Sequence, residues 1–445
     1  MDRRHFLRTA ALSALSAATT ARGATPPQDR YARFRNQTLV MSIPSHPHYD
    51  AMLRVLPIFT RDTGIHVEVD KLQILRMKDK QLLEMAKPQG DYDIVSYVVM
   101  WKSEYVRKNL IRELSPFMQD PALADPSFDL ADIVPVYLEN IGLVGGPRGY
   151  LAGPEAKLYG LPYGAETSIL AYRADIFESL GLQPPRTYDQ LRALLPRLRE
   201  RAGIGALTSR GQAGHQCVHA WLLHLDPLGG KVFDAQWHPR FNDAAGVEAL
   251  TLLKLISDTG PAGIPGYGQG EMMTAFLQGQ AAMYLDSTIL FGTVRDPARS
   301  RVGGKVAYAL HPRGVRQASQ SGGLGLAIPR NARHPEAAFL LLQWLTAKRQ
   351  DRAVALAGGI PIRSSTMADP ELLRRYPEYR IMLEQLQYAD PDWRPIIAEW
   401  DEINVQMLGV AISQALTGRV PPQAALDGAV PAVTDLMQRG GYYKA

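Results

Sequence analysis

Hydrophobic and polar residues alternate with two different periods along the first hundred residues. Residues 37–43 (QTLVMSI), 65–72 (IHVEVDKL) and 92–99 (YDIVSYVV) are short apolar or alternating runs, which predict β-strands. Between the first two, residues 48–64 (HYDAMLRVLPIFTRDTG) have apolar side chains at helical spacing and end in a glycine, a common helix stop. Strands that alternate with helices predict βα units and a parallel sheet, so we expect an α/β fold.

The middle of the chain continues the mixture of strands and helices. Residues 159–173 (YGLPYGAETSILAYR) place turn residues directly before an apolar, strand-like run, with one acid between them. Residues 173–182 predict a helix that Gly181 closes, and Thr187 is a suitable N-cap for the next helix. Residues 119–158 are rich in Pro, Gly and Asp and predict connections with short helices. Because 445 residues are too many for one ordinary core, we expect two or three domains.

Residues 1–23 have the composition of an export signal. A basic start, RRHFLR, precedes a run of small, mildly apolar residues that is far shorter than a membrane span. RRHFLR looks like the twin-arginine signal, which exports folded proteins; an ordinary secretory leader is the alternative. No cysteine lies near this segment to take a lipid anchor, and no later run is apolar enough to span a bilayer. We therefore expect a mature protein that is free in the periplasm and not membrane-anchored.

Composition and charge place the chain among soluble globular proteins. It is 46% hydrophobic and 21% charged, with a formal net charge of +5. Four arginines and one aspartate in the first 23 residues account for much of that charge, so we predict no nucleic-acid partner. The single cysteine, Cys217, excludes an intramolecular disulfide.

A search for catalytic motifs finds no paired-histidine zinc helix, no nucleophile elbow and no P-loop. The histidine clusters HPH (46–48) and HQCVH (215–219) lack a matching second pair at metal-binding spacing, so loop or cleft histidines are the favoured interpretation. The acids of EWDE (399–402) have a place in glycosidase chemistry, but a solvated helix face explains them as well. We predict no enzyme activity, no metal and no cofactor; an exported carbohydrate-active hydrolase is the alternative.

Several aromatic residues fall in predicted loops or at strand ends. Flat aromatic faces stack on the C–H faces of polyhydroxylated ligands, while nearby polar groups hydrogen-bond the hydroxyls. Taken alone, each is better explained as a core residue. The set is Tyr97, Trp101, Tyr163, Trp221, Trp393 and Trp400.

An ordered series of sequence blocks resembles a known family. The blocks are FTRDTGIHVEV, GDYDIVSYVVMW, YGLPYGAETSILAYRADIFESLGLQPPRTYDQL, FLQGQAAMYLD, GGLGLAIPRNARHPEAAFLLLQWLT and GGIPIRSS. Together they span nearly the whole mature chain and resemble extracellular solute-binding protein family 1, the periplasmic sugar- and polyol-binding components of ABC importers, which includes maltose-binding protein. The third block is the most specific, and the order of the blocks is stronger evidence than any one of them.

The resemblance implies a two-lobe periplasmic-binding-protein fold with discontinuous lobes and a central ligand cleft. The N-terminal lobe would comprise residues 31–164 and 324–358, and the C-terminal lobe residues 165–323 and 359–445. Three crossover segments, at 162–166, 321–323 and 359–363, would converge on the cleft, and the lobes would close on the ligand by a hinge.

The resemblance also implies a set of ligand-binding positions. Glu166, at the first crossover, would hydrogen-bond ligand hydroxyls; a structural carboxylate beside a helix N-terminus is the alternative. Arg363 would point into the cleft from the third crossover, and Trp400 would supply a stacking ring. The full set is Ser42, His46, His48, Tyr97, Trp101, Tyr163, Glu166, His215, Gln216, Asp286, Gly322, Gly323, Arg363 and Trp400.

One departure from the family pattern narrows the expected ligand. Sugar binders often have Trp shortly after AAM, whereas this chain continues YLDSTILF, so an oligosaccharide is disfavoured. The stretches SYVVMWKSEYVRKNLI and RPIIAEWDEI look more like the branch that handles polyols and small monosaccharides. We expect a monomer that binds a small sugar or polyol and delivers it to the transmembrane subunits of an ABC permease. Service to a sensor or chemoreceptor instead of import is a further alternative.

Overall fold

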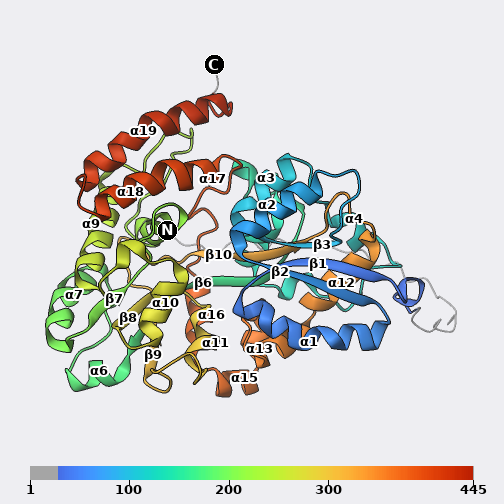
Figure 1. The fold of residues 1–445 in the computed structure, drawn as a ribbon, viewed down its shortest axis with the longest axis horizontal. Coiled ribbons are helices and arrows are strands. Elements are labelled where there is room, and N and C mark those ends of the chain that lie inside the picture. The colour runs from blue at the N-terminus through green and yellow to red at the C-terminus, as the bar shows by residue number, and fades with distance from the viewer. Residues whose placement is uncertain (1–28, 444–445) are drawn as a thin grey trace, which may run out of the picture.

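The computed structural model describes residues 29–443, apart from the side chain of Leu75, and forms two lobes (Figure 1). The predicted export signal, residues 1–23, lies outside the described residues. Within them, no helix combines the length and apolar character needed to cross a bilayer. The first lobe surrounds β1, β2 and β3, and the second surrounds β7, β8 and β9, with β6 and β10 running between them (Figure 1).

One sheet with the strand order β2-β1-β3-β10-β6-β8-β7 runs through both lobes, and β9 pairs with β6. β1 is parallel to β2 and β3, and β7 is parallel to β8, as the alternating sequence pattern predicts. β10 and β6 are antiparallel to their neighbours. The strands are β1 (Thr38–Pro44), β2 (His66–Leu72), β3 (Ile94–Val98), β6 (Leu161–Arg173), β7 (Gly205–Thr208), β8 (Ala281–Ser287), β9 (Val306–Ala309) and β10 (Ser321–Ala327).

The helices of the first lobe come from two separate parts of the chain. α1 ends at Gly64, whose φ of +73° suits glycine, and Pro57 lies inside it. α13 follows the second crossover and returns to pack against α1, so this lobe is discontinuous. Its main helices are α1 (Pro47–Thr63), α2 (Ile74–Met85), α3 (Lys102–Arg107), α12 (Pro335–Thr346) and α13 (Lys348–Leu356). The segment 119–158, which follows α4 (Ser115–Gln119), contains the short helix α5 (Pro135–Tyr137) as predicted. It also contains two short strands that were not predicted, β4 (Leu143–Val144) and β5 (Lys157–Leu158).

The second lobe is covered by helices from the middle and the end of the chain. Thr187 caps α7 by accepting a hydrogen bond from the Gln190 amide, as predicted. The C-terminal helices α18 and α19 pack on α8 and α9. The helices are α6 (Ala174–Ser179), α7 (Tyr188–Ala202), α8 (His215–Leu225), α9 (Ala244–Thr259), α10 (Gln269–Leu277), α11 (Leu290–Val294), α14 (Ser364–Met367), α15 (Pro370–Arg375), α16 (Glu378–Leu386), α17 (Trp400–Glu402), α18 (Gly409–Leu416) and α19 (Pro422–Arg439).

The first two crossovers are paired strands. Gly322 of β10 lies opposite Glu166 of β6, and Gly323 lies opposite Ala165. Gly323 has φ +100°, and a Cβ there would lie 2.3 Å from the carbonyl oxygen of Gly164, so only glycine allows the strands to approach this closely. The pairing fixes Glu166 and Gly322 side by side between the lobes.

The third crossover, residues 359–363, contributes no residue to the cavity described below, so the expected convergence of all three crossovers on the cleft is wrong for this segment. The amide of Ile360 donates to Nδ1 of His48 over 3.1 Å, and the carbonyl of Ile362 accepts from the amide of Val134 over 3.0 Å. The chain then passes through α14 and α15 to α16, which contacts β6 and β9. The exact lobe boundaries expected from the sequence stay predictions.

Candidate functional site

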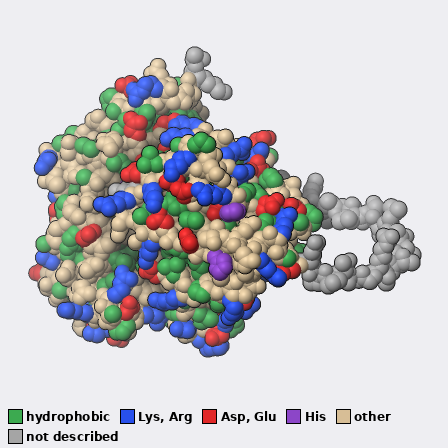
Figure 2. All heavy atoms as spheres, turned by 45° about the vertical axis from the view of Figure 1, so that its right-hand side comes forward, with side chains coloured by type: hydrophobic (Ala, Val, Ile, Leu, Met, Phe, Trp, Pro, Cys, Tyr) green, Lys and Arg blue, Asp and Glu red, His purple; other side chains and the backbone are tan. Residues whose placement is uncertain are grey.

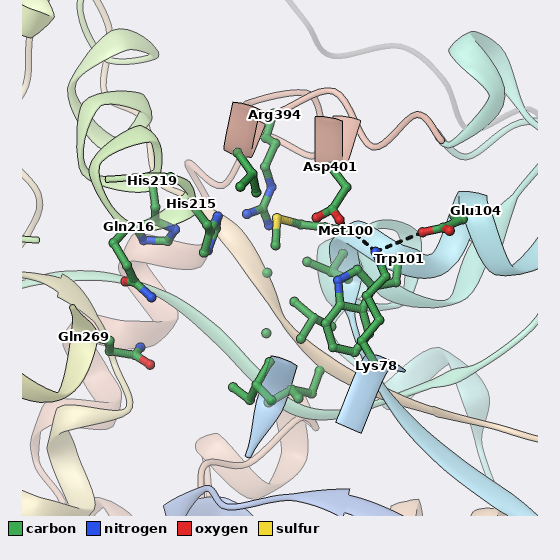
Figure 3. A pocket seen from close by; sticks show the side chains of 18 of the residues that line it. Lys78, Met100, Trp101, Glu104, His215, Gln216, His219, Gln269, Arg394 and Asp401 are labelled. Carbon is green, nitrogen blue, oxygen red and sulfur yellow. Dashed lines mark hydrogen bonds and ion pairs between the residues drawn. The ribbon is translucent and has the colours of Figure 1, made fainter. Parts of the chain in front are cut away.

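A cavity of about 700 Å³ lies between the lobes, where β6 and β10 cross (Figure 3). The first lobe contributes Met100 and Trp101 from the segment after β3, and the second contributes His215 and Gln216 from the start of α8. The segment 387–399, which joins α16 to α17, contributes Arg394 from a third direction (Figure 3).

Glu166 reaches the cavity from β6. Among the first eleven residues of that strand it alone keeps partial exposure, because the pleat and the crossing turn it toward the cavity. Its carboxylate accepts a hydrogen bond from the hydroxyl of Ser287 at the end of β8. Burial raises the pKa of Glu166, while Arg210 and Ser287 oppose that shift. The hydrogen-bond partner of the Glu166 carboxylate is thus the hydroxyl of Ser287, the last residue of β8.

Arg210 lines the cavity and is held by a buried carboxylate. Its Nε donates to Oδ2 of Asp286 over 2.9 Å, and its Nη2 donates to Oδ1 of the same group. Burial alone would raise the pKa of Asp286, but Arg210 lowers it well below its usual range. Arg210 also contacts Oε1 of Gln216 over 3.3 Å. Asp286 thus lies one layer behind the cavity and orients Arg210.

Arg394 is a buried charge at the cavity that forms no ion pair with the described residues. Its side chain is 3% exposed, and its Nε is buried without a hydrogen-bond partner among the described residues. Its guanidinium lies 4.6 Å from the ring centre of Trp393. Burial lowers the pKa of Arg394 to about 9, although Glu166 acts in the opposite direction.

Gln320 presents a second set of unused polar atoms. It lines the cavity directly before β10, and both its amide oxygen and its amide nitrogen are buried without partners in the described chain. A buried polar group without a partner costs about 1–3 kcal/mol, and buried polar groups therefore usually have a hydrogen-bond partner. Gln320 and Arg394 therefore give the cavity hydrogen-bonding capacity that the described residues do not use.

The histidines at the cavity are uncharged at neutral pH. Burial lowers the pKa of His46 and of His219 to about 4, and that of His215 well below its usual value. Nδ1 of His215 lies 3.1 Å from the side-chain nitrogen of Asn404, which acts as the donor. These rings offer neutral donors and acceptors rather than positive charge.

The outer end of the cavity is bridged by an ion-pair cluster. Nζ of Lys78 on α2 lies 3.0 Å from a carboxylate oxygen of Glu104 and 2.8 Å from one of Asp401 (Figure 3). Lys78 also lies 5.5 Å from the ring centre of Trp101. Because α2 belongs to the first lobe and α17 to the C-terminal helices, the Lys78–Asp401 contact joins the two sides of the cavity.

Seven of the fourteen residues expected at the cleft line the cavity. They are His46, Trp101, Glu166, His215, Gln216, Gly322 and Gly323. Asp286 acts behind the surface through Arg210, and the six others do not line the cavity. Contact of the seven with a ligand stays a prediction.

Arg363 and Trp400 are placed elsewhere than expected. Arg363 is fully buried away from the cavity; its guanidinium donates to the carbonyls of Thr346, Phe128 and Asp129 over 2.6, 2.9 and 2.8 Å. These acceptors in the first lobe hold it and prevent it from pointing into the cleft. Trp400 is fully buried as well, and the residues after it on the same helical segment line the cavity instead.

Four further expected residues belong to the core behind the cavity. Tyr97 donates to the carbonyl of Ile141 over 2.8 Å, and Ser42 accepts from the side chain of Gln81 over 3.1 Å. His48 accepts from the amide of Ile360, as described above, and its ring centre lies 4.5 Å from that of Tyr163. Of the six aromatics singled out from the sequence, Trp101 alone lines the cavity in the described structure.

The sequence interpretation did not select several cavity residues. Arg394 lies in the stretch RPIIAEWDEI and Gln320 directly precedes the SGG crossover, so both stand inside stretches that carried the resemblance or next to them. His219 lies in the HQCVH cluster noted in the sequence but was not selected as a ligand-binding residue, and Arg210 and Gln269 follow no motif. Among residues 29–443, no group of three or more His, Cys, Asp or Glu side chains is placed to hold a metal ion.

This fold and this cavity define a two-lobed binding protein with its ligand site between the lobes. The chain belongs to the bacterial extracellular solute-binding proteins, because the model of that family matches residues 47–352. A probable amino-acid ABC transporter periplasmic-binding protein of Sinorhizobium fredii is 27% identical over 406 residues, covering 89% of this chain and 88% of the relative.

Two other similar proteins have named ligands. A mannitol-binding protein of Pseudomonas aeruginosa is 28% identical over 392 residues, covering 83% of this chain and 85% of the relative. The solved structure of an ABC transporter solute-binding protein from Agrobacterium radiobacter, in complex with ribitol, is similar with a TM-score of 0.81 and 27% identity, covering 90% of this chain and 99% of that one.

Proposed function

We propose that this protein binds a small alditol of five or six carbons in the cavity between its lobes and delivers it to an ABC permease. The main support is the set of unused buried polar atoms on Gln320 and Arg394, next to the partly exposed carboxylate of Glu166. A ligand with hydroxyls along its length can donate and accept at neighbouring positions, and so satisfies such a mixed set. Relatives that bind mannitol and ribitol support the same class.

The acids of the cavity support binding without bond cleavage. A glycosidase needs two carboxylates free to act across one bond. Asp286 is engaged by Arg210, and both Glu104 and Asp401 by Lys78, so the acids in ion pairs are not free to act with Glu166. Glu402 also lines the cavity, on the same helical segment as Asp401 in the outer cluster. We therefore extend the proposal to a protein without enzyme activity.

We propose a monomer that is exported to the periplasm by the twin-arginine pathway and closes on its ligand by a hinge. Acidic and basic side chains are interspersed on the face shown in Figure 2, which favours a small-molecule partner over nucleic acid. The proposed protein partners are the transmembrane subunits of the permease.

A thermal-shift and calorimetry panel tests the proposal. Ribitol, D-mannitol and D-glucitol would be compared with maltose and with a set of amino acids. A ligand present at a hundred times its Kd raises the free energy of unfolding by about 2.7 kcal/mol, which is a clear rise in Tm. We expect that rise with at least one alditol; a rise with an amino acid alone, or with maltose alone, would overturn the ligand class.

A further inference from the structure

Two positive and two negative side chains lie at or directly behind the cavity wall around β6 and β10, and they differ in how fully they are paired. Arg210 and Asp286 form a buried ion pair with two hydrogen bonds. Glu166 and Arg394 form no ion pair with one another in the described structure. They are nevertheless close enough to interact electrostatically: Glu166 is the opposite charge that raises the pKa of Arg394, and Arg394 acts on Glu166 together with Arg210. The histidines close enough to interact with Arg210 and Arg394 are His215 and His219, and burial lowers the pKa of both so that they are neutral. The formal charges therefore balance, and one charge of each sign is left for a ligand.

The strand pairing brings these two free charges to the same point. Glu166 lies opposite Gly322 across the β6–β10 pair. A Cβ at Gly322 would lie 3.3 Å from Nη2 of Arg394, so the guanidinium lies directly over that glycine. A carboxylate that only accepts and a guanidinium that only donates thus flank one short stretch of the cavity.

We propose that Glu166 and Arg394 act as a matched acceptor and donor that select an uncharged vicinal diol and exclude sugar acids and amino sugars. This inference rests on the proposed function. One hydroxyl of the diol donates to Glu166, and its neighbour accepts from Arg394. A ligand carboxylate would be attracted by Arg394 but repelled by Glu166. A ligand ammonium would be attracted by Glu166 but repelled by Arg394, so each charged ligand is buried beside a like charge.

Three ligands with one carbon skeleton test this selection by calorimetry. D-Glucitol, D-gluconate and 1-amino-1-deoxy-D-glucitol differ only at C1, which is a hydroxymethyl, a carboxylate or an aminomethyl group. For the native protein at pH 7, we expect D-glucitol to bind at least about tenfold more tightly than either charged analogue, a factor equivalent to 1.4 kcal/mol. If the five-carbon skeleton binds better, ribitol, D-ribonate and 1-amino-1-deoxyribitol replace the set.

Two substitutions should shift the preference in opposite directions. Glu166→Gln leaves an excess positive charge and should raise the affinity ratio of gluconate to glucitol by about tenfold. Arg394→Gln leaves an excess negative charge and should raise the ratio of the amine to glucitol by a similar factor of about ten. Because each readout is a ratio, a general loss of affinity does not imitate it. Glu200→Gln and Arg197→Gln make the same charge changes on the exposed face of α7 and should leave both ratios unchanged.

The outcomes separate this inference from the proposed function. If no alditol binds to the folded protein, the proposed function fails and the inference with it. If glucitol or ribitol binds but its acid binds equally well or better, the function stands and the inference is overturned. Unchanged ratios in both cavity variants, with native circular dichroism, would overturn it too.

Discussion

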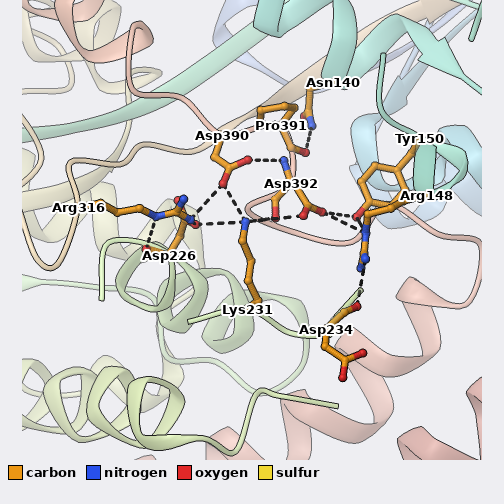
Figure 4. A network of polar contacts seen from close by, with 10 residues as sticks. All are labelled: Asn140, Arg148, Tyr150, Asp226, Lys231, Asp234, Arg316, Asp390, Pro391 and Asp392. Atoms are coloured by element: carbon orange, nitrogen blue, oxygen red, sulfur yellow. Dashed lines mark hydrogen bonds and ion pairs between the residues drawn. The ribbon is translucent and has the colours of Figure 1, made fainter. Parts of the chain in front are cut away.

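The segment 387–399 contributes charged residues to two polar sites, and the charges are paired in one site and unpaired in the other. At Asp390–Asp392 it joins the lobes through a network in which the charges are paired (Figure 4). Lys231 of the second lobe lies 2.8 Å from Asp390, and Asn140 of the first lobe donates to the carbonyl of Pro391 over 3.0 Å. Four residues after Asp390, Arg394 is buried at the cavity with its Nε unpaired.

The difference separates groups that hold the structure from groups that await a ligand. In the network, Arg316 contacts both Asp226 and Asp390, and Arg148 lies 3.6 Å from Asp392. Trp393 lies between the two sites and donates from Nε1 to the carbonyl of Ser321 over 2.7 Å, which fixes the segment to β10. The paired charges hold the two lobes in this arrangement. An unpaired buried charge lowers the free energy of unfolding as long as no ligand provides it with a partner.

The largest expected effect is that of Arg394→Met on binding. Loss of a charged donor to a ligand hydroxyl should weaken alditol binding by about 2–3 kcal/mol, measured by calorimetry. The free energy of unfolding without ligand should not fall, because the substitution removes a buried charge that lacks a partner. A urea titration checks this second arm. A clear loss of stability with unchanged affinity would place Arg394 with the structural network instead.

Lys231→Met should show the opposite pattern. It leaves Asp390 and Asp226 with fewer positive partners and should reduce the free energy of unfolding by about 1–3 kcal/mol, a range that allows for its partial exposure. The surface pair Lys254–Asp258 offers a control, since Lys254→Met should change stability by less than about 0.5 kcal/mol. Equal urea midpoints for the two variants would contradict a structural role for the network.

The fold was predictable from the sequence because strand and helix patterns are local. The alternation of apolar runs gave β1, α1, β2 and β3 in order, and the glycines at 322 and 323 marked a strand crossing. Glu166 was selected because an acid between a turn and a buried strand is unusual, and the structure places it at the cavity.

The rest of the site depends on distant partners that no local pattern encodes. Arg363 lies in the expected segment, but carbonyls from residues 128, 129 and 346 determine where its long side chain points. Arg394 and Gln320 are distinguished by what they lack, namely hydrogen-bond partners, and a lack of partners is visible only in three dimensions. Side-chain length alone did not decide the outcome, since Glu166 and Gln216 line the cavity as expected while Ser42 and Arg363 do not.

The cavity histidines should make the free energy of unfolding decrease as the pH falls. The folded-state pKa of His219 is about 4, below the value of 6.5 for the free side chain, so the folded protein binds fewer protons between those values. Its contribution to stability is present above pH 6.5 and is lost as the pH falls toward 4. His219→Gln should reduce the loss between pH 7 and 5 by about 1–2 kcal/mol, measured by urea titration at each pH. An unchanged slope would mean that burial does not lower the pKa of His219 in the folded state.

The smallest expected effect tests how closely Arg394 is positioned. In Gly322→Ala, the new methyl group would lie 3.3 Å from Nη2, and the end of a flexible side chain can move by that margin. We expect alditol affinity to fall by about 1 kcal/mol or less, with little change in urea stability, because the guanidinium shifts while the strand keeps its pairing. Gly323→Ala is the matched contrast: its Cβ would meet the carbonyl oxygen of Gly164 at 2.3 Å, and backbone cannot yield as a side chain does. Equal effects of the two alanines on stability would contradict the close approach of β10 to β6 at Gly323. They would also contradict the inference that the contact at residue 322 is with a movable side chain.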